Sequence, residues 1–278
     1  MVNGHEAAPT GVAFVLRFVA KGGAMRKRAL HIPVVAVVAV VAAGSLLVAE
    51  PAEAATIELS TAQGPIDPGG INQGWWTATG PANVNPNTNY FVGKDDLGRE
   101  FRDFFTFDLR LIPRDLTVVG ATLRVNAGFS TAGDLIETVG FFDVSTDAVT
   151  LNRNTGTSEA IFADLGTGRS YGTFPVNRGT LGDLSFVLNA DAVADINASR
   201  PGYFSLGGRL LSFSRPDAEF RFGGTEGLVA RLIVDAFPLP RTPQECKGGG
   251  WRNLTDDRGE PFRSQGQCIL FVRQHPQI

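Results

Sequence analysis

The stretch FRDFFTFDL, residues 101–109, constrains the fold more than any other part of the sequence. Successive side chains of a strand point to opposite faces, so the odd-numbered positions share one face, and four of these five are apolar. Phe104 lies on the other face and breaks the alternation with polar residues. The pattern therefore predicts a strand that is buried on much of both faces.

Eight further segments have the length and composition of strands, and turn residues separate most of them. They are residues 56–59, 116–125, 135–144, 172–176, 183–188, 203–211, 219–222 and 229–236. One short helix is expected at 189–198, which is rich in alanine, and a weaker helical turn at 158–165. Nine short strands with so little helix predict an all-β fold over residues 55–236, a β-sandwich of jelly-roll-like topology.

An export signal is expected at the start of the chain. Basic residues follow Met25, an apolar run occupies 32–48, and Ala52-Glu53-Ala54 fits a small-residue cleavage site. We therefore expect residues 1–54 to be removed, with Met25 as the true start. The alternative is an uncleaved membrane anchor, because the apolar run is close to the roughly 17–25 residues that span a bilayer.

Charge and histidine content exclude several function classes for the mature chain. The whole chain has 25 basic and 28 acidic residues, and five basic and three acidic ones precede residue 55, which leaves 20 and 25. No basic patch for nucleic acid or anionic membrane remains. His275 is the last histidine, and it stands in a polar terminal tail where neither a serine triad nor a zinc site is expected.

Cys246 and Cys268 are the only cysteines of the chain. In an exported protein such a pair is most simply a disulfide, and a metal site or a redox centre would need further ligands or closer spacing. Residues 237–245 contain three prolines and predict an extended linker. The sequence thus predicts a small disulfide-closed segment over 246–278, outside the sandwich.

Five aromatic residues are candidate ligand contacts: Trp75, Trp76, Tyr90, Tyr171 and Tyr203. Aromatic faces suit the flat apolar surfaces of sugar rings. The alternative is a role in the core or at its rim, and if Trp75 and Trp76 lie in a strand, they point to opposite faces.

Four carboxylates cluster around one turn and the start of a strand: Asp95, Asp96, Glu100 and Asp103. Calcium prefers several oxygen ligands, and a carboxylate pair could act as general acid and base. Turn chemistry and solvated charge are the alternative, because Lys94, Arg99 and Arg102 lie among them. Calcium is the only cofactor that the sequence suggests.

The chain resembles an uncharacterised family of secreted bacterial β-sandwich proteins, many of which carry a PEP-CTERM sorting tail. The resemblance covers residues 72–236 and rests on NYFVGKDDLGREFRDFFTFDL, VVGATLRV, ETVGFFDVST, IFADLGTGRSYG, FVLNADAVADINASRPGYFSLGG and VARLIVDA. It implies the fold and export but no activity. The sorting tail itself is absent from this sequence.

The C-terminal segment is similar to a short motif of secreted bacterial proteins, Cys-x-x-Gly-Gly-Trp followed by Phe-x-x-Gln-Gly-x-Cys. The matching residues are Cys246, Gly249, Gly250, Trp251, Phe262, Gln265, Gly266 and Cys268. This similarity also implies no activity.

The sequence as a whole predicts a secreted, non-catalytic module that binds an extracellular glycan or surface protein, with no nucleic-acid partner and no membrane span after cleavage. A carbohydrate-binding module is the first alternative. A carboxylate-based glycan hydrolase or lyase is the second, since such enzymes need only two carboxyl groups.

Overall fold

The computed structural model describes residues 54–66, 70–80, 89–131, 134–153, 157–213, 219–223 and 228–276. They belong to one compact unit that spans Val48–Ile278. The expected export signal lies outside the described residues except for its last position. No helix in the described part of the chain is long and apolar enough to cross a membrane.

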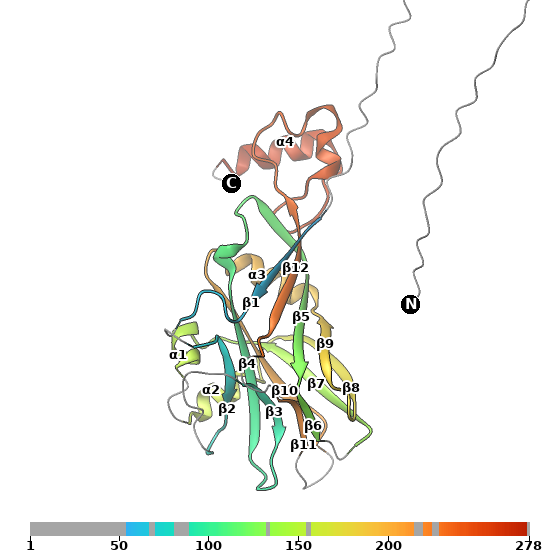
Figure 1. Ribbon diagram of the computed structural model, residues 1–278. Coiled ribbons are helices and arrows are strands. Elements are labelled where there is room, and N and C mark those ends of the chain that lie inside the picture. The colour runs from blue at the N-terminus through green and yellow to red at the C-terminus, as the bar shows by residue number, and fades with distance from the viewer. Residues whose placement is uncertain are drawn as a thin grey trace, which may run out of the picture. The chain divides into compact units, whose positions relative to one another are not determined.

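The structure is built from two antiparallel sheets (Figure 1). The four-stranded sheet has the order β1-β12-β5-β9, and the eight-stranded sheet has the order β6-β11-β3-β4-β10-β7-β8, with β2 paired to β4. The first sheet consists of β1 (Ala55–Ser60), β5 (Leu116–Ala127), β9 (Gly182–Val187) and β12 (Arg231–Pro238). The second consists of β2 (Gln73–Trp76), β3 (Phe91–Lys94), β4 (Glu100–Asp108), β6 (Phe129–Thr131), β7 (Ile136–Asp143), β8 (Ser170–Asn177), β10 (Tyr203–Leu210) and β11 (Glu219–Gly223).

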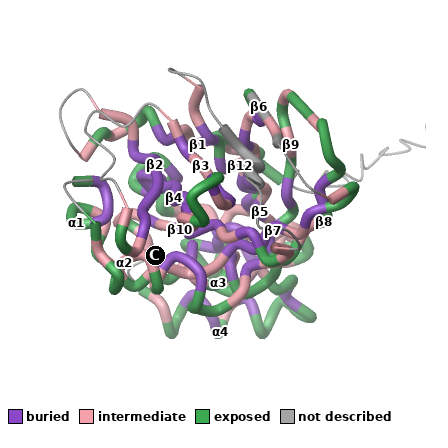
Figure 2. The backbone as a smooth tube through the Cα atoms, turned by 90° about the horizontal axis from the view of Figure 1, so that it is seen from below, coloured by how far each residue is buried: buried purple, intermediate pink, exposed green. Residues whose placement is uncertain are grey.

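One hydrophobic core joins the two sheets, as expected for a β-sandwich, and Figure 2 shows that buried residues run along their strands. The central strand β4 is buried on both faces, as its sequence predicts. Core residues from the four-stranded sheet include Leu59, Leu123, Val125, Leu232 and Val234, and those from the eight-stranded sheet include Phe105, Phe107, Val139, Phe141, Phe204 and Leu206.

The outer face of the eight-stranded sheet has a smaller core of its own, in which Phe104 and Trp76 pack beneath two short helices. These are α1 (Ala148–Asn152) and α2 (Glu159–Asp164), whose first turns are capped by Asp147 and Ser158. The end of α2 rests directly on β10, because a Cβ atom at Gly207 would overlap the main chain of Leu165.

Two longer helices lie in the second half of the sequence. The expected helix 189–198 is confirmed as α3 (Ala190–Ala198), with Asn189 Oδ1 accepting the N–H of Ala192 at 3.1 Å. Helix α4 (Gln265–Gln274) was not expected, since the sequence analysis predicts only a disulfide-closed segment over 246–278 without assigning it a helix. The weaker helical turn expected at 158–165 is also confirmed, as α2, so the helices that the sequence analysis missed are α1 and α4.

The C-terminal segment has its own hydrophobic cluster around the disulfide between Cys246 and Cys268, whose Cα atoms are 5.7 Å apart. Its elements are the 3-10 turns at Lys247–Asn253 and helix α4. Leu239 belongs to this cluster although β12 ends at Pro238, so the first residues of the expected linker over 237–245 lie in the strand and in the cluster.

Candidate anion-binding pocket

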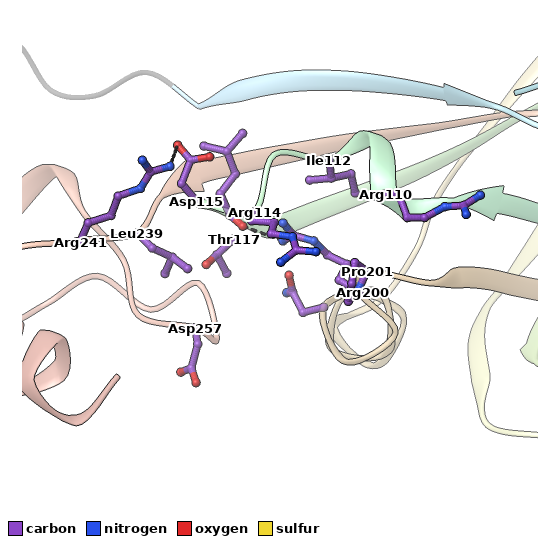
Figure 3. Close-up of a pocket in the computed structure, with 12 residues that line it drawn as sticks. Arg110, Ile112, Arg114, Asp115, Thr117, Arg200, Pro201, Leu239, Arg241 and Asp257 are labelled. Carbon is purple, nitrogen blue, oxygen red and sulfur yellow. Dashed lines mark hydrogen bonds and ion pairs between the residues drawn. The ribbon is translucent and has the colours of Figure 1, made fainter. Parts of the chain in front are cut away.

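A pocket of about 770 Å³ opens where three stretches of chain meet beside the C-terminal segment (Figure 3). The stretches are the loop between β4 and β5, the connection from α3 to β10, and the chain that follows β12. Four arginines and two aspartates line the pocket: Arg110, Arg114, Arg200, Arg241, Asp115 and Asp257. Its charge is therefore positive in a protein whose net charge is negative.

Arg200 fixes two walls of the pocket to each other. Its guanidinium donates hydrogen bonds of 2.6 Å to the carbonyl oxygens of Leu116 and Pro113. Burial lowers the pKa of Arg200 below its ordinary value, partly offset by the charge of Asp115, but a guanidinium stays protonated in proteins. A partly desolvated cation that is bonded to neutral carbonyls favours an anion beside it.

Asp115 connects the third wall of the pocket, the chain that follows β12, to the loop between β4 and β5. Arg241 lies 2.8 Å from its carboxylate, and the N–H of Leu239 donates a 2.7 Å hydrogen bond to its main-chain oxygen. The ion pair is shown by the dashed line in Figure 3. One of the two pocket carboxylates is thus already neutralised by a pocket arginine.

Arg114 stands out from the other pocket arginines. It is exposed, and within the described part of the chain it has no hydrogen-bond or ion-pair partner. Arg110, by contrast, points away from the group in Figure 3 and pairs with Asp108 at 2.7 Å. Arg114, Arg200 and Arg241 therefore make up the positive face of the pocket, which we call the arginine pocket.

The sequence carries one weak signal for this site, which the motifs and clusters described above do not include. Each of the three arginines adjoins a proline at the end of an element: Pro113 before Arg114, Pro201 after Arg200, and Pro240 before Arg241. A proline at such a boundary fixes the backbone from which the neighbouring side chain extends. These prolines do not indicate that the three arginines lie close together in the folded protein.

Four of the five candidate aromatic residues are buried. Trp75 packs edge-on against Phe101 at 4.9 Å between centroids, and Trp76 donates its indole N–H to the carbonyl of Leu151 at 3.2 Å. As the strand geometry predicts, the two rings lie on opposite faces of the sheet. With 8% and 5% of their surfaces exposed, they form no open stacking platform.

The tyrosines also have internal roles. The Tyr90 hydroxyl donates to the carbonyl of Asn126 in the opposite sheet at 2.8 Å, and the residue is 0% exposed. The Tyr171 hydroxyl donates to Asp195 at 2.9 Å. Tyr203 is partly exposed, but Arg110 lies over its ring at 4.8 Å and donates to its hydroxyl.

Tyr171 and Tyr203 do line one polar hollow of about 370 Å³, together with Asp143 and Asp195. Arg169 lies 3.5 Å from Asp195 and also borders the hollow. Arg169 is the one basic residue among those that line this hollow, and three aspartates line it as well, so the hollow lacks the positive excess of the arginine pocket.

The four clustered carboxylates do not converge. Asp95 binds Arg99 at 2.6 Å; burial would raise its pKa, but the hydrogen bonds and charge of Arg99 outweigh burial and lower it. Asp96 is exposed, and Glu100 pairs with Arg102 at 2.9 Å. The described residues contain no group of three or more His, Cys, Asp or Glu that could hold a metal ion.

Asp103 differs from the other three because it faces the interior core. It is 0% exposed, and neither of its carboxyl oxygens has a hydrogen-bond partner of normal geometry among the described residues. Burial raises its pKa well above the ordinary value, and the main-chain N–H groups of Asp103 and Gly208 offset this only in part. Its carboxyl fits against the neighbouring strand because Gly208 has no side chain there.

Glu137 is the other fully buried carboxylate on the core face of this sheet. The register places Asp103 across from Gly208, and Gly208 across from Phe141, four residues along β7 from Glu137. At about 3.3 Å per residue, the backbone positions of the two residues are offset by about 13 Å along the strands alone, and their side chains lie on the same face of the sheet. This exceeds the roughly 5–10 Å that glycoside hydrolases need.

Comparisons with known proteins add no family: no protein-family model matches the chain, and no curated protein matches it significantly. The fold and the site therefore define the class, a two-sheet β protein with a disulfide-closed C-terminal segment and an arginine-lined pocket beside it.

Proposed function

We propose that this protein is an exported, non-catalytic β-sandwich module that binds an anionic group of an extracellular partner. The observation that carries the proposal is the meeting of Arg114, Arg200 and Arg241 at one pocket from three distant parts of the sequence. Guanidinium groups bind carboxylate, sulfate and phosphate through charge-assisted hydrogen bonds. They stay protonated, so they suit binding rather than proton transfer.

The proposed topology is jelly-roll-like. In support, the chain crosses between the two sheets from β4 to β5, from β8 to β9 and from β9 to β10. Such crossings are typical of Greek-key sandwiches.

The proposed export has two supports, the signal-like sequence before residue 55 and the disulfide between Cys246 and Cys268. The check is N-terminal sequencing of the protein from the producing cells' medium. We expect the mature chain to begin at Ala55, and a chain that stays in the cell with both thiols free would contradict this part.

The binding proposal is tested by isothermal titration with three short ligands, triaspartate, a uronic acid trisaccharide and a neutral trisaccharide. We expect both anions to bind and the neutral sugar not to bind. Arg114→Ala should weaken anion binding about tenfold, the effect of one charge-assisted pair. The effect should shrink at high salt, because the pocket is open to solvent.

The matched control is Arg178→Ala. Arg178 is an exposed arginine in the turn between β8 and β9. The pairing of Ala127 with Gly182 puts this turn at the far end of β5 from the pocket. Equal anion binding by both variants and the unchanged protein would contradict the site, and tight binding of the neutral sugar would favour the carbohydrate-binding alternative.

A further inference from the structure

The arginine pocket continues into a second hollow of about 810 Å³. Asn197 and Asp257 line both, so the two are adjoining parts of one groove. The second part runs between α3 and β5, and the turn 256–260 of the C-terminal segment borders it. We call this second part the aliphatic groove.

The side chains of the aliphatic groove are mostly small and apolar: Val119, Ala121, Val187, Val193 and Ala194. Val187 is 72% exposed at its edge, and Ala194 is an exposed position of α3. No Phe, Tyr or Trp is among the described residues that line either part. Sugar rings are usually bound by stacking on aromatic faces, whereas aliphatic walls fit the side chains of a peptide.

The walls of the groove are already fixed in the structure. The Asn197 side chain ties α3 to β5, donating to the Val118 carbonyl at 2.8 Å and accepting its N–H at 3.1 Å. Asp256 Oδ1 accepts the N–H groups of Arg258 and Glu260, each at 2.9 Å, and closes the turn 256–260.

Gly259 then brings that turn against β5. Its φ angle is +80°, and a Cβ atom there would lie 2.6 Å from a methyl group of Val119. A groove with preformed walls binds without the entropy cost of ordering them.

We infer that the groove and the arginine pocket together bind an extended segment of a partner protein in which aliphatic residues adjoin acidic ones. The inference rests on the proposed anion site and names the partner's chemistry. Aliphatic side chains lie along α3, and the carboxylates contact Arg114, Arg200 and Arg241. The path from Ala190 to Arg200 is about 15 Å at 1.5 Å per residue, which matches about five residues of extended chain.

The test uses the purified protein and the dye-labelled, C-terminally amidated peptide Val-Ala-Val-Asp-Asp-Asp, followed by fluorescence anisotropy. Two comparison ligands are Gly-Ala-Gly-Asp-Asp-Asp, which lacks the aliphatic side chains, and the uronic acid trisaccharide as competitor. We expect the first peptide to bind at least about tenfold more tightly than either.

Two variants separate the groove from the pocket. Ala194→Gln adds an uncharged side chain to the groove at an exposed helical position, and Ala160→Gln makes the same change on α2, away from it. We expect Ala194→Gln to remove the advantage of the valine peptide and to leave the glycine peptide unchanged. Ala160→Gln should change neither.

If Ala194→Gln and Ala160→Gln behave alike while Arg114→Ala still weakens anion binding, the peptide groove is refuted and the anion pocket stands. Equal or tighter binding of the trisaccharide refutes the peptide partner in the same way. If Arg114→Ala and Arg178→Ala also behave alike, both the groove and the proposed function are refuted.

Discussion

At the scale of single residues, the structure reassigns the groups that looked most functional. The candidate aromatic residues mainly build cores, and Tyr90 links the two sheets by its hydroxyl. Asp103 belongs to a strand whose apolar neighbours are core residues, and among the described residues no group of normal hydrogen-bond geometry meets its carboxyl in that core. A buried carboxyl of this kind is retained in its neutral form, because burial penalises the charge.

Asp103 should make the protein less stable as the pH rises. Its pKa is raised in the folded state, so the unfolded chain gives up this proton first. The stability contribution is complete below about pH 4, the ordinary pKa, and is lost as the pH rises toward the folded-state pKa. Between the unfolded-state and the folded-state pKa, the free energy of unfolding falls by at most about 1.4 kcal/mol per pH unit.

Asp103→Asn removes the titrating carboxyl group. The check is urea unfolding of the variant and of the unchanged protein from pH 4 to pH 8. We expect the free energy of unfolding of the variant to rise relative to that of the unchanged protein across this range. Parallel curves would show that the Asp103 carboxyl has its ordinary pKa. Asp96→Asn, at an exposed position, is the control and should give parallel curves.

At the scale of elements, the C-terminal segment is held by few apolar contacts. Its buried residues are Leu239, Phe262, Phe271 and Val272 besides the two half-cystines. So small a cluster cannot offset the entropy of ordering about 30 residues without a cross-link. The disulfide closes a loop with a sequence separation of 22 and should stabilise the segment by about 3 kcal/mol.

Replacing both cysteines by serine should therefore unfold this segment and leave the sandwich folded. In limited proteolysis, cleavage should move into residues 240–276 while a fragment that ends near Pro238 resists. Anion binding should weaken as well, because Arg241 belongs to the released wall. Rapid proteolysis of the sandwich together with the segment would show that the two are one cooperative unit and would contradict this prediction.

At the scale of the whole molecule, most of the sandwich could be predicted because local pattern reports directly on strands. All nine expected strands are present, within a few residues of their predicted ends. The missed strands β2, β3 and β6 have only three or four residues, too few for an alternating pattern to show. Helix α4 was missed although Ser264 and Gln267 have the spacing of a helix start.

The arginine pocket could not be predicted from the sequence. Arg114, Arg200 and Arg241 are separated by 86 and 41 positions, and each alone looks like an ordinary solvated residue. Only the crossing of the chain between two sheets brings their three loops together at one end. The aliphatic groove could not be predicted either, because its walls come from three separate parts of the sequence, β5, α3 and the C-terminal turn.

The claim that these arginines form one anion site is tested most directly by NMR of the arginine side-chain Nε–Hε groups during titration with triaspartate. We expect the signals of Arg114, Arg200 and Arg241 to shift together with a single dissociation constant. The signals of Arg178 and Arg153, outside the pocket, should stay in place. Shifts spread evenly over all exposed arginines, or confined to arginines outside the pocket, would contradict the account.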